Sequence, residues 1–383
     1  MRILILCADA STNSVVRIQP IAKVLQRNHD VLVGGFRSQE TLFEPYSDEL
    51  DYRTERTRPL PSFLTQVHRM VSSASADLVY AFKPRSTSMW TGLAVRRRLG
   101  VPLVLDIEDW ELGWYLDQPW VNRLKHLRHV SSPNGFAWTA LNEKLIERCD
   151  HRFVVSSFLQ RRFGGTLLRH GPYTVAFSPD RLTRDDALAE LGLPAARYIL
   201  FAGSVMRNKG VEDLLLCVER LALRDVRVLL VGSSRHDPAY HQQLVSRFGH
   251  LLAVVGPRPH REMPVFLAAS SLIVLAQRTA RETIAQVPGK AFEAMAMARP
   301  VIATAVSDLP EILDGAGVVI PPGDHEALKS AVITLLHDEA LASSMGTAAR
   351  ARCVEQFGWD AMERILERDL ERLRIGWQDE PAR

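Results

Sequence analysis

The chain has 383 residues, of which 46% are hydrophobic and 24% charged, as in an ordinary globular protein long enough for two domains. Its 47 basic and 44 acidic residues leave a net charge of +3, too small to indicate a nucleic-acid-binding protein. No apolar run approaches the roughly 20 residues of a membrane-spanning helix, and the short apolar start lacks a signal-peptide cleavage pattern. The four cysteines are isolated, which argues against a zinc site or a disulfide framework and favours a reducing cytoplasm.

The first half of the chain alternates short apolar runs with helical patterns. The opening run is continuous, as in a parallel strand buried on both faces. Apolar residues then recur at three- and four-residue steps before the next run, which predicts a β-α-β unit. A later helix is predicted over residues 86–99, ending at Gly100. Strands are predicted at residues 2–8, 31–33, 78–81, 101–107 and 152–156.

Residues 166–187 interrupt this alternation, because they hold Gly171, Pro172 and Pro179 and show little periodicity. We interpret this segment as the linker between two domains. A second α/β set follows it. Its strands are predicted at residues 198–203, 226–232, 253–255, 271–276, 301–304 and 318–320, and its helices at 211–223, 290–297 and 359–373.

Strands that alternate with helices predict a parallel sheet with helices on both faces. Two such sets predict an α/β protein of two Rossmann-like, doubly wound domains facing a central cleft. We expect an N-terminal domain over residues 1–172, a C-terminal domain over residues 173–357, and a final helical segment over residues 358–383 that packs back toward the N-terminal domain. Such sheets bind ligands beyond the carboxyl ends of their strands, so the cleft is the expected site.

The first candidate for chemistry is the loop at residues 203–210, which reads GSVMRNKG between a predicted strand and a predicted helix. Backbone N–H groups and the helix dipole, with Arg207 and Lys209 beside them, suit a diphosphate. A solvated basic turn explains the same residues equally well, and the spacing alone leaves both interpretations open.

The second candidate is the segment at residues 286–296, where Lys290 and Glu293 lie three positions apart and share one face of a helix near its start. A carboxylate there can accept both hydrogen bonds from a ribose diol, as an acidic residue does in dinucleotide sites. An exposed helical ion pair is the more common explanation of this spacing.

The third candidate is the loop at residues 306–311, between a strand and a short helix. Its first backbone amides could contact phosphate or sugar hydroxyls. Ser307 or Asp308 is equally an ordinary N-cap, with Pro310 and Glu311 in the first turn, and the two interpretations are compatible.

In order and spacing these features resemble the retaining glycosyltransferases of family 4, which have the GT-B fold. The family pattern combines a G-x…R-x-x-K-G loop, a helix and strand reading E-A-M-A-x-x-x-P-V-I-A-T, and a loop ending in L-P-E. Residues 293–304 of this chain read EAMAMARPVIAT, and the resemblance is strongest over residues 198–311.

The resemblance implies roles for residues of the C-terminal domain. Lys209 would bind the diphosphate of a nucleotide-sugar donor and Glu293 its ribose hydroxyls, which with Arg207 makes three residues expected to carry catalysis. The other expected donor-binding residues are Gly203, Ser204, Gln286, Lys290, Asp308, Leu309 and Glu311.

The chain departs from the family pattern at two positions. Many members carry a glutamate eight positions before the helix glutamate, where this chain has Ala285. The residues that follow resemble a subgroup with P-x-K-x-x-E, in which Lys290 would reach the donor. Ser204 stands where an arginine often follows the loop glycine, and Arg207 is close enough in sequence to replace it.

The N-terminal domain is expected to hold the acceptor. Glu108 and Asp109 follow a predicted strand, and in many relatives a histidine occupies about the place of Glu108. Acids at a strand end suggest recognition of acceptor hydroxyls or, as the weaker alternative, a base, while capping and solvation of an irregular loop explain them equally well. Arg17 could line the cleft, and Lys83 and Arg85 could bind an anionic acceptor, although simple exposure is the more ordinary explanation of each.

Aromatic residues precede a basic stretch in the same domain. Such a mixture could dock on anionic lipid headgroups or stack on a bulky acceptor. A packed loop with a solvated helix is the more ordinary interpretation. The aromatic residues are Trp110, Trp114, Tyr115 and Trp120, and the basic stretch holds Arg123, Lys125, His126, Arg128 and His129.

The sequence therefore predicts a retaining hexosyltransferase that moves a hexose from a UDP- or GDP-sugar to a hydroxyl of a glycan, lipid-linked or small natural-product acceptor. The resemblance supplies the retention. No cofactor is expected, and because the chain has no Asp-x-Asp motif we expect Lys209 and Arg207 to replace a metal. The alternative is a weak or silent GT-B-like protein that binds nucleotide or glycan without turnover, which Ala285 and Ser204 favour.

We expect a cytoplasmic protein, with the inner face of the membrane as the alternative location through a weak peripheral contact. No nucleic-acid partner is expected, and the oligomeric state is left open by the sequence.

Overall fold

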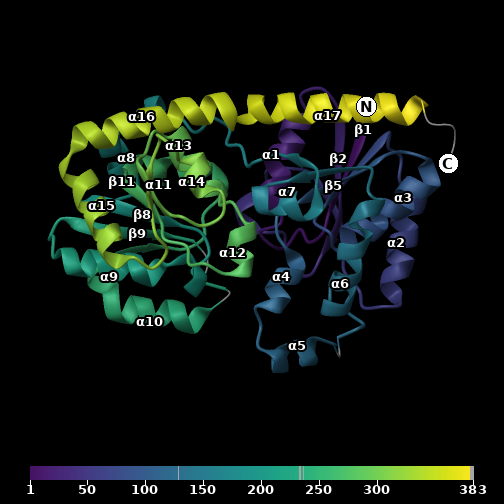
Figure 1. Ribbon diagram of the computed structural model, residues 1–383, viewed down its shortest axis with the longest axis horizontal. Coiled ribbons are helices and arrows are strands. Elements are labelled where there is room, and N and C mark those ends of the chain that lie inside the picture. The colour runs from purple at the N-terminus through teal and green to yellow at the C-terminus, as the bar shows by residue number, and fades with distance from the viewer. Residues whose placement is uncertain (128, 233, 236, 380–383) are drawn as a thin grey trace. The chain divides into compact units, whose positions relative to one another are not determined.

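The computed structural model describes residues 1–127, 129–232, 234–235 and 237–379 (Figure 1). Arg128 and residues 380–383, which belong to two of the segments discussed above, lie outside the described residues. The chain forms two compact units: the first is Met1–Arg169 together with the chain from Met362 onward, and the second is His170–Ala361. The sequence-based boundaries after residues 172 and 357 remain predictions.

The first unit is built on a seven-stranded parallel sheet in the order β3-β2-β1-β4-β5-β6-β7. Its central strands are buried along almost their whole length, as expected for a sheet covered on both faces. The strands are β1 (Arg2–Cys7), β2 (Asp30–Arg37), β3 (Tyr52–Arg56), β4 (Leu78–Phe82), β5 (Leu103–Ile107), β6 (His151–Val154) and β7 (Thr166–Leu167).

Helices connect these strands, and the predicted helix over residues 86–99 is a π-helical turn followed by an α-helix. That helix ends at Gly100, whose φ of 65° makes a left-handed C-cap. The helices are α1 (Val15–Leu25), α2 (Ser62–Ser73), α3 (Thr91–Leu99), α4 (Glu111–Leu116), α5 (Trp120–Leu127), α6 (Phe136–Leu145) and α7 (Ser157–Phe163), with short turns η1 (Glu44–Tyr46), η2 (Ser86–Trp90) and η3 (Ile146–Arg148).

The second unit holds a six-stranded parallel sheet in the order β10-β9-β8-β11-β12-β13. Its strand order reverses between β8 and β11, as the order of the first sheet does between β1 and β4, so both sheets are doubly wound. The strands are β8 (Arg197–Ala202), β9 (Val226–Val231), β10 (Leu252–Val255), β11 (Ser270–Leu275), β12 (Val301–Thr304) and β13 (Val318–Ile320).

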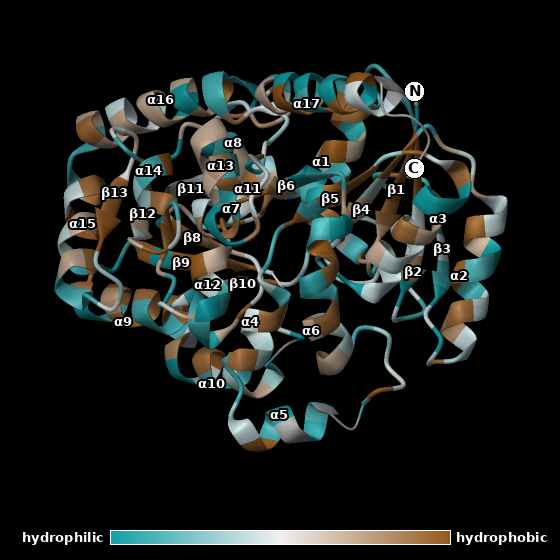
Figure 2. Cartoon of the chain, turned by 45° about the vertical axis from the view of Figure 1, so that its right-hand side comes forward, coloured by the Kyte–Doolittle hydropathy of each residue, from teal (hydrophilic) through white to brown (hydrophobic). Residues whose placement is uncertain are grey.

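The helices of the second unit pack on the sheet around a core of aliphatic and aromatic side chains. The hydrophobic residues of the chain are brown in the cartoon of Figure 2. The helices are α8 (Arg184–Glu190), α9 (Val211–Leu221), α10 (Pro238–Phe248), α11 (Met263–Ala269), α12 (Arg281–Ala285), α13 (Gly289–Ala296), α14 (Leu309–Ile312), α15 (His325–His337) and α16 (Glu339–Gln356), with turns η4 (Pro179–Arg181), η5 (Arg207–Lys209), η6 (Gly249–Leu251) and η7 (His260–Glu262).

The last helix, α17 (Trp359–Asp379), starts in the second unit and continues on the first. Glu363 accepts a hydrogen bond from Asn28 at 2.7 Å, and Asp369 pairs with His151 at 3.3 Å. Near its end, the indole of Trp377 donates to the carbonyl of Gly100 at 2.9 Å. The first unit is therefore completed by residues from both ends of the chain.

Two segments differ from the sequence-based interpretation. The supposed linker over residues 166–187 is partly regular, because β7 pairs with β6 and α8 begins at Arg184. The edge strand β3 was missed, since its sequence YRTER is almost entirely polar and carries no apolar run. It is held instead by five register pairs to β2.

Arg17 forms a buried ion pair in the core of the first unit, which contradicts both expectations for it, namely a residue that lines the cleft to bind an acceptor and a simply exposed one. Its side chain is 0% exposed, and Nε and one terminal nitrogen donate to the two carboxylate oxygens of Asp106 at 2.6 and 3.0 Å. The same terminal nitrogen donates to the carbonyl of Leu168 at 2.8 Å, and the hydroxyl of Tyr80 donates to Asp106. The pair therefore joins α1, β4, β5 and the residue after β7.

Removing one partner of this pair should destabilise the protein strongly. In Asp106→Leu the guanidinium of Arg17 loses its buried counter-charge, and we expect the free energy of unfolding to fall by about 3–5 kcal/mol in urea titrations. The double variant Arg17→Met, Asp106→Leu should recover most of that loss, because no buried charge is left. Equal stabilities of the single and double variants would contradict this account.

Candidate functional site

The carboxyl ends of β8, β11 and β12 lie side by side in the second sheet, at the point where the strand order reverses. Loops that follow such strands form the ligand-binding edge of a doubly wound sheet. All three segments singled out in this half of the sequence leave from this edge: residues 203–210 after β8, residues 286–296 on the way from β11 to β12, and residues 306–311 after β12.

Glycines give the loop after β8 its path. Gly203 has a φ of 122°, and a Cβ on Gly232 would come within 1.9 Å of the Gly203 carbonyl oxygen. Gly210 has a φ of 69°, and a Cβ there would lie 1.8 Å from the carbonyl oxygen of Ala276. Neither Gly232 nor Gly210 accepts a side chain without backbone movement, so the loop packs directly on the backbone of its neighbours. This packing places Lys209 at the edge of the sheet.

Two lysine ammonium groups lie at this edge of the sheet. Lys209 Nζ donates to the side-chain oxygen of Gln286 at 2.9 Å. Lys290 Nζ donates to the carbonyl of Ala202, the last residue of β8, at 2.5 Å and lies 4.5 Å from the centroid of the Phe201 ring. Burial, reinforced by the charge of Lys209 and opposed by Glu293, lowers the pKa of Lys290 to about 7. An anion bound here would relieve that cost.

Glu293 lies one turn along α13, and its hydrogen-bond partner is a different residue from that of Lys290. Its Oε1 is 2.9 Å from Nε2 of His260, whose ring lies 5.3 Å from that of Phe177. The exposed helical ion pair that the spacing favoured is therefore not what forms. His260 was missed by sequence reasoning, because it stands alone in the turn η7 and belongs to no motif.

The loop after β12 places a short helix, α14, beside this edge. Ser307 has a φ of 54°, and Asp308 is buried at the N-cap position with its backbone oxygen accepting from Ile312 at 2.9 Å. The side chain of Asp308 does not cap the helix. Leu309 is buried and packs the loop down, whereas Glu311 is exposed and its carbonyl oxygen accepts from Arg352 at 2.9 Å.

The two departures from the family pattern have distinct surroundings. Ala285 is fully buried at the end of α12, and Ser204 is partly exposed in the loop after β8. That Arg207 replaces the missing arginine remains a prediction: its guanidinium carbon lies 4.3 Å from the Tyr240 ring centroid, and its Nε is 3.6 Å from Asp237. It is 60% exposed on the α10 side of the loop.

Gln277 is a further polar residue that the sequence reading missed. It follows β11, is 2% exposed, and its carbonyl oxygen accepts from Thr304 at 2.7 Å. Within the described chain, both polar atoms of its side chain are buried without a hydrogen-bond partner, as is the hydroxyl of Ser307. Its position just after the end of β11, where a doubly wound sheet binds ligands, is the sequence feature that could have predicted it.

The first unit carries a second charged cluster, at the carboxyl ends of β4 and β5. Lys83, with a φ of 65°, is buried and in contact with Asp109, and its Nζ lies 3.5 Å from Glu111 and 3.6 Å from Glu108. Arg85 donates to Glu111 at 2.9 Å. Lys83 and Arg85 are therefore paired with acids instead of being simply exposed.

Glu108 has the most perturbed carboxyl of this cluster. Burial raises its pKa to about 8, with Lys83 opposing the rise and Asp109 adding to it. Burial works against the charged form of Lys83 too, but Asp109 and Glu111 outweigh it and raise the pKa of that lysine. A carboxyl that titrates near neutral pH can accept or donate a proton at working pH.

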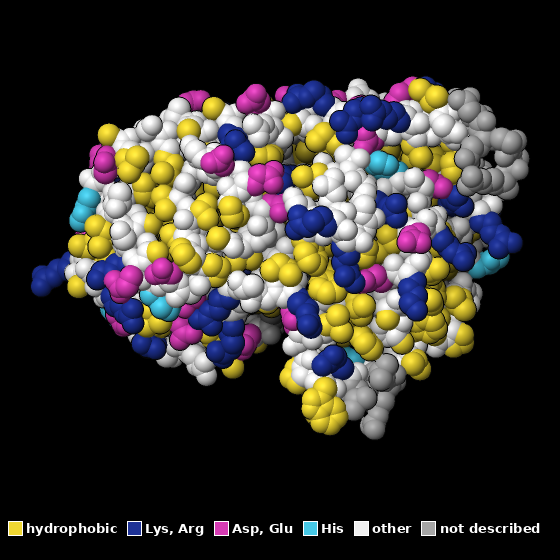
Figure 3. Space-filling model, in the orientation of Figure 1, with side chains coloured by type: hydrophobic (Ala, Val, Ile, Leu, Met, Phe, Trp, Pro, Cys, Tyr) yellow, Lys and Arg dark blue, Asp and Glu magenta, His cyan; other side chains and the backbone are white. Residues whose placement is uncertain are grey.

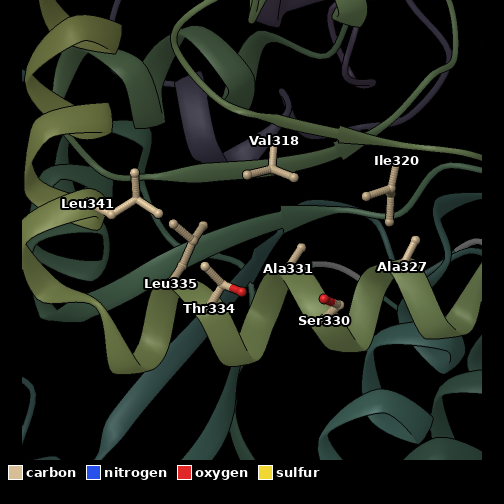
Figure 4. A pocket seen from close by; sticks show the side chains of 8 residues that line it. All are labelled: Val318, Ile320, Ala327, Ser330, Ala331, Thr334, Leu335 and Leu341. Carbon is tan, nitrogen blue, oxygen red and sulfur yellow. The ribbon is translucent and has the colours of Figure 1, made fainter.

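A hollow of about 340 Å³ in the second unit lies between the edge strand β13 and helix α15 (Figure 4). Its walls are aliphatic apart from two hydroxyl groups, and none of the candidate residues above contributes to it. It is therefore a groove in the packing of the edge strand and not the site of the lysine cluster. The lining residues are Val318, Ile320, Ala327, Ser330, Ala331, Thr334, Leu335 and Leu341.

No group of three metal-ligating side chains suited to a metal ion is found within the described ranges. Within the same residues, no helix combines the length and the apolar character needed to cross a bilayer.

Fold and site together define a GT-B glycosyltransferase. The family described as glycosyl transferases group 1 matches residues 196–338, and the glycosyl transferase 4-like domain matches residues 14–176. The chain belongs to glycosyltransferase family 4.

The similar proteins cover this chain to different extents. Alpha-maltose-1-phosphate synthase of Mycolicibacterium smegmatis is 31% identical over 54% of this chain and 56% of its own, so the match spans little more than half of that relative. The GDP-mannose-dependent alpha-(1-6)-phosphatidylinositol monomannoside mannosyltransferase of the same species is 26% identical over 79% of this chain and 78% of its own. The Anabaena protein HepE, solved with UDP-glucose, superposes with a TM-score of 0.75 at 18% identity, covering 97% of this chain and 100% of its own. The predicted two-domain GT-B architecture is confirmed by such structures.

The raised pKa of Glu108 predicts how stability depends on pH. A carboxyl with an ordinary pKa of 4.5 and a folded-state value of about 8 stabilises the fold fully below pH 4.5 and loses that contribution as pH rises toward 8. Glu108→Gln removes this titration, so the variant should gain stability relative to wild type between pH 5 and about 8 in urea unfolding. A difference between the two proteins that stays constant over this range would show that Glu108 titrates normally.

Proposed function

We propose that this chain is a retaining hexosyltransferase that moves a hexose from a nucleotide-diphosphate sugar to a hydroxyl group of an acceptor. The observation that carries the proposal is the pair of ammonium groups of Lys209 and Lys290, held by an amide and a backbone carbonyl at the switch point of the second sheet. Two neighbouring ammonium groups at the carboxyl ends of parallel strands attract the negative charge of a diphosphate.

Glu293 supplies the second part of the proposed donor site. Its Oε1 contacts His260, and this contact holds the carboxylate in place. Glu293 lies one turn along α13, on the same helix as Lys290. The resemblance to family 4 assigns such a glutamate to the ribose hydroxyls. With the diphosphate on the lysines, the ribose would reach this carboxylate, and Gln286, Asp308 and Leu309 would line the same edge.

The donor class is supported by the proteins that the chain resembles. HepE was solved with UDP-glucose, and the mannosyltransferase of M. smegmatis is described as dependent on GDP-mannose. We therefore propose a UDP- or GDP-sugar. The same mannosyltransferase acts on a phosphatidylinositol monomannoside, which supports a lipid-linked acceptor among the glycan, lipid-linked and small natural-product classes.

The proposed reaction needs no covalent intermediate. The bond from the anomeric carbon to the diphosphate oxygen breaks, the bond from the anomeric carbon to the acceptor oxygen forms on the same face, and the acceptor proton passes to the departing phosphate oxygen. The products are a glycoside with retained configuration and a nucleoside diphosphate. Lys209 and Lys290 stabilise the charge that develops on the leaving group, so we propose that no metal or other cofactor is required.

The acidic cluster of the first unit is the proposed acceptor site. Glu108, Asp109 and Arg85 offer hydrogen-bond acceptors and a partly exposed guanidinium at the carboxyl ends of β4 and β5. Hydroxyl groups of a sugar or an inositol would bind to such carboxylates.

One observation favours a second function. Ala285, where many relatives have a sugar-contacting glutamate, is fully buried and offers no polar group to a donor hexose. This favours a protein that binds a nucleotide or glycan without turnover. Consumption of the nucleotide sugar separates the two functions, because the binding protein would leave the donor intact.

A nucleotide screen tests the donor site. At a hundred times its dissociation constant, UDP or GDP should add about 2.7 kcal/mol to the free energy of unfolding of the wild type, seen as a thermal shift. Glu293→Ala should lose most of that shift, whereas Glu190→Ala, an exposed glutamate at the end of α8, should keep it. The shift and the donor turnover should persist in EDTA. A shift that is the same in all three proteins, or one that needs a metal, would contradict the proposed site.

The lowered pKa of Lys290 predicts the pH dependence of donor binding. A bound diphosphate favours the ammonium form and raises its pKa, so above about pH 7 binding takes up a proton and affinity falls, by at most about tenfold per pH unit. Lys290→Arg keeps the charge and should flatten this fall between pH 7 and about 9 in calorimetric titrations with UDP or GDP. The same slope in both proteins would exclude Lys290 as the titrating group.

A further inference from the structure

Exposed apolar side chains gather around α5 in the first unit. The described residues contain twelve large apolar side chains that are exposed, and five of them come from residues 114–141. The most exposed of the twelve is Trp120, at 67%. These five are Trp114, Trp120, Val121, Val130 and Leu141, and we call the area that they form with α5 the α5 surface.

The local packing fixes this surface. Helices α4 and α5 both pack against α6. The ring of Tyr115 on α4 meets that of Trp114 at 4.9 Å and that of His126 on α5 at 5.3 Å, edge to face in both cases. The carbonyl of Val130 accepts a hydrogen bond from the indole of Trp138 on α6 at 2.7 Å. Trp120 and Val121 are thus the exposed start of a helix whose other contacts are made inside the unit.

Basic residues outnumber acidic ones in the same stretch. Between residues 114 and 141, Asp117 is the one acidic residue of the sequence, whereas α5 alone carries Arg123, Lys125 and His126. In Figure 3 dark blue and yellow side chains gather together over the α5 end of the first unit. Lys125 is exposed, so its ammonium is free to face a surface of opposite charge.

We propose that the α5 surface docks the protein on an anionic bilayer, with α5 lying in the headgroup layer. Indole rings are favoured at this depth, a short helix with apolar and cationic sides lies in the interface plane, and basic residues are attracted by anionic lipids. Charge complementarity selects this occupant over a second copy of the chain, whose α5 surface would carry the same positive charge. The inference stands on the surface alone and does not require the proposed transferase reaction.

The test is co-sedimentation of the full chain with vesicles of phosphatidylcholine, with or without phosphatidylglycerol. The wild type should bind the anionic vesicles and release them as salt is raised, because attraction to charged lipids is screened. Trp120→Ser with Val121→Ser should weaken that binding about tenfold or more, and Lys125→Ser about fivefold. Val354→Ser, which removes an exposed apolar side chain of α16 in the other unit, should have no effect.

Each outcome decides the proposal. Thermal unfolding and the nucleotide-induced shift should be unchanged in every variant, because these residues are exposed and belong to no candidate site. Failure of the wild type to bind anionic vesicles overturns the proposal, and so does binding that the α5 substitutions leave intact. Dimers in sedimentation velocity that Trp120→Ser with Val121→Ser abolishes, without vesicle binding, would show an interface between copies instead.

Discussion

The buried ion pair of Arg17 and Asp106 is the interaction on which the first unit depends. It joins α1, β4, β5 and the chain after β7 through the two side chains, the hydroxyl of Tyr80 and one backbone carbonyl. Asp106 is also the second-last residue of β5, directly before the acidic cluster of Glu108 and Asp109. Two charges without solvent exposure are stable only while their geometry is kept, so the pair fixes where that cluster leaves the sheet.

The pKa values of buried cations shift in opposite directions in the two units. In the first, Lys83 and Arg85 are neutralised by carboxylates, and their pKa values rise. In the second, Lys209 and Lys290 contact an amide and a carbonyl, and the pKa of Lys290 falls to about 7. A cation already paired gains little from an anion, whereas one buried beside another cation gains much. The lowered pKa of Lys290 therefore supports our proposal that a diphosphate binds in the second unit.

The sequence predicted what depends on local pattern. Apolar runs predicted the buried strands, and the pattern around Glu293 predicted the helix that carries this residue and its place at the edge of the second sheet. It missed what depends on tertiary contact: the polar strand β3, the partner His260, and the burial of Arg17, whose counter-ion lies 89 positions away. The contact of Arg207 with the ring of Tyr240 likewise depends on tertiary structure and was not predicted from its nearness to Lys209 in sequence.

The order of elements in the first unit links its acidic cluster to its apolar surface. Glu111 ends the cluster and begins α4, and a short turn then leads to Trp120 at the start of α5. A six-residue helix spans only about 9 Å, so the carboxylates and the exposed indole belong to one continuous stretch of chain. If α5 lies in the headgroup layer as we propose, the proposed acceptor residues Glu108 and Asp109 are a short stretch of chain from the membrane surface. The layout of the first unit is thus compatible with the lipid-linked acceptor that we propose.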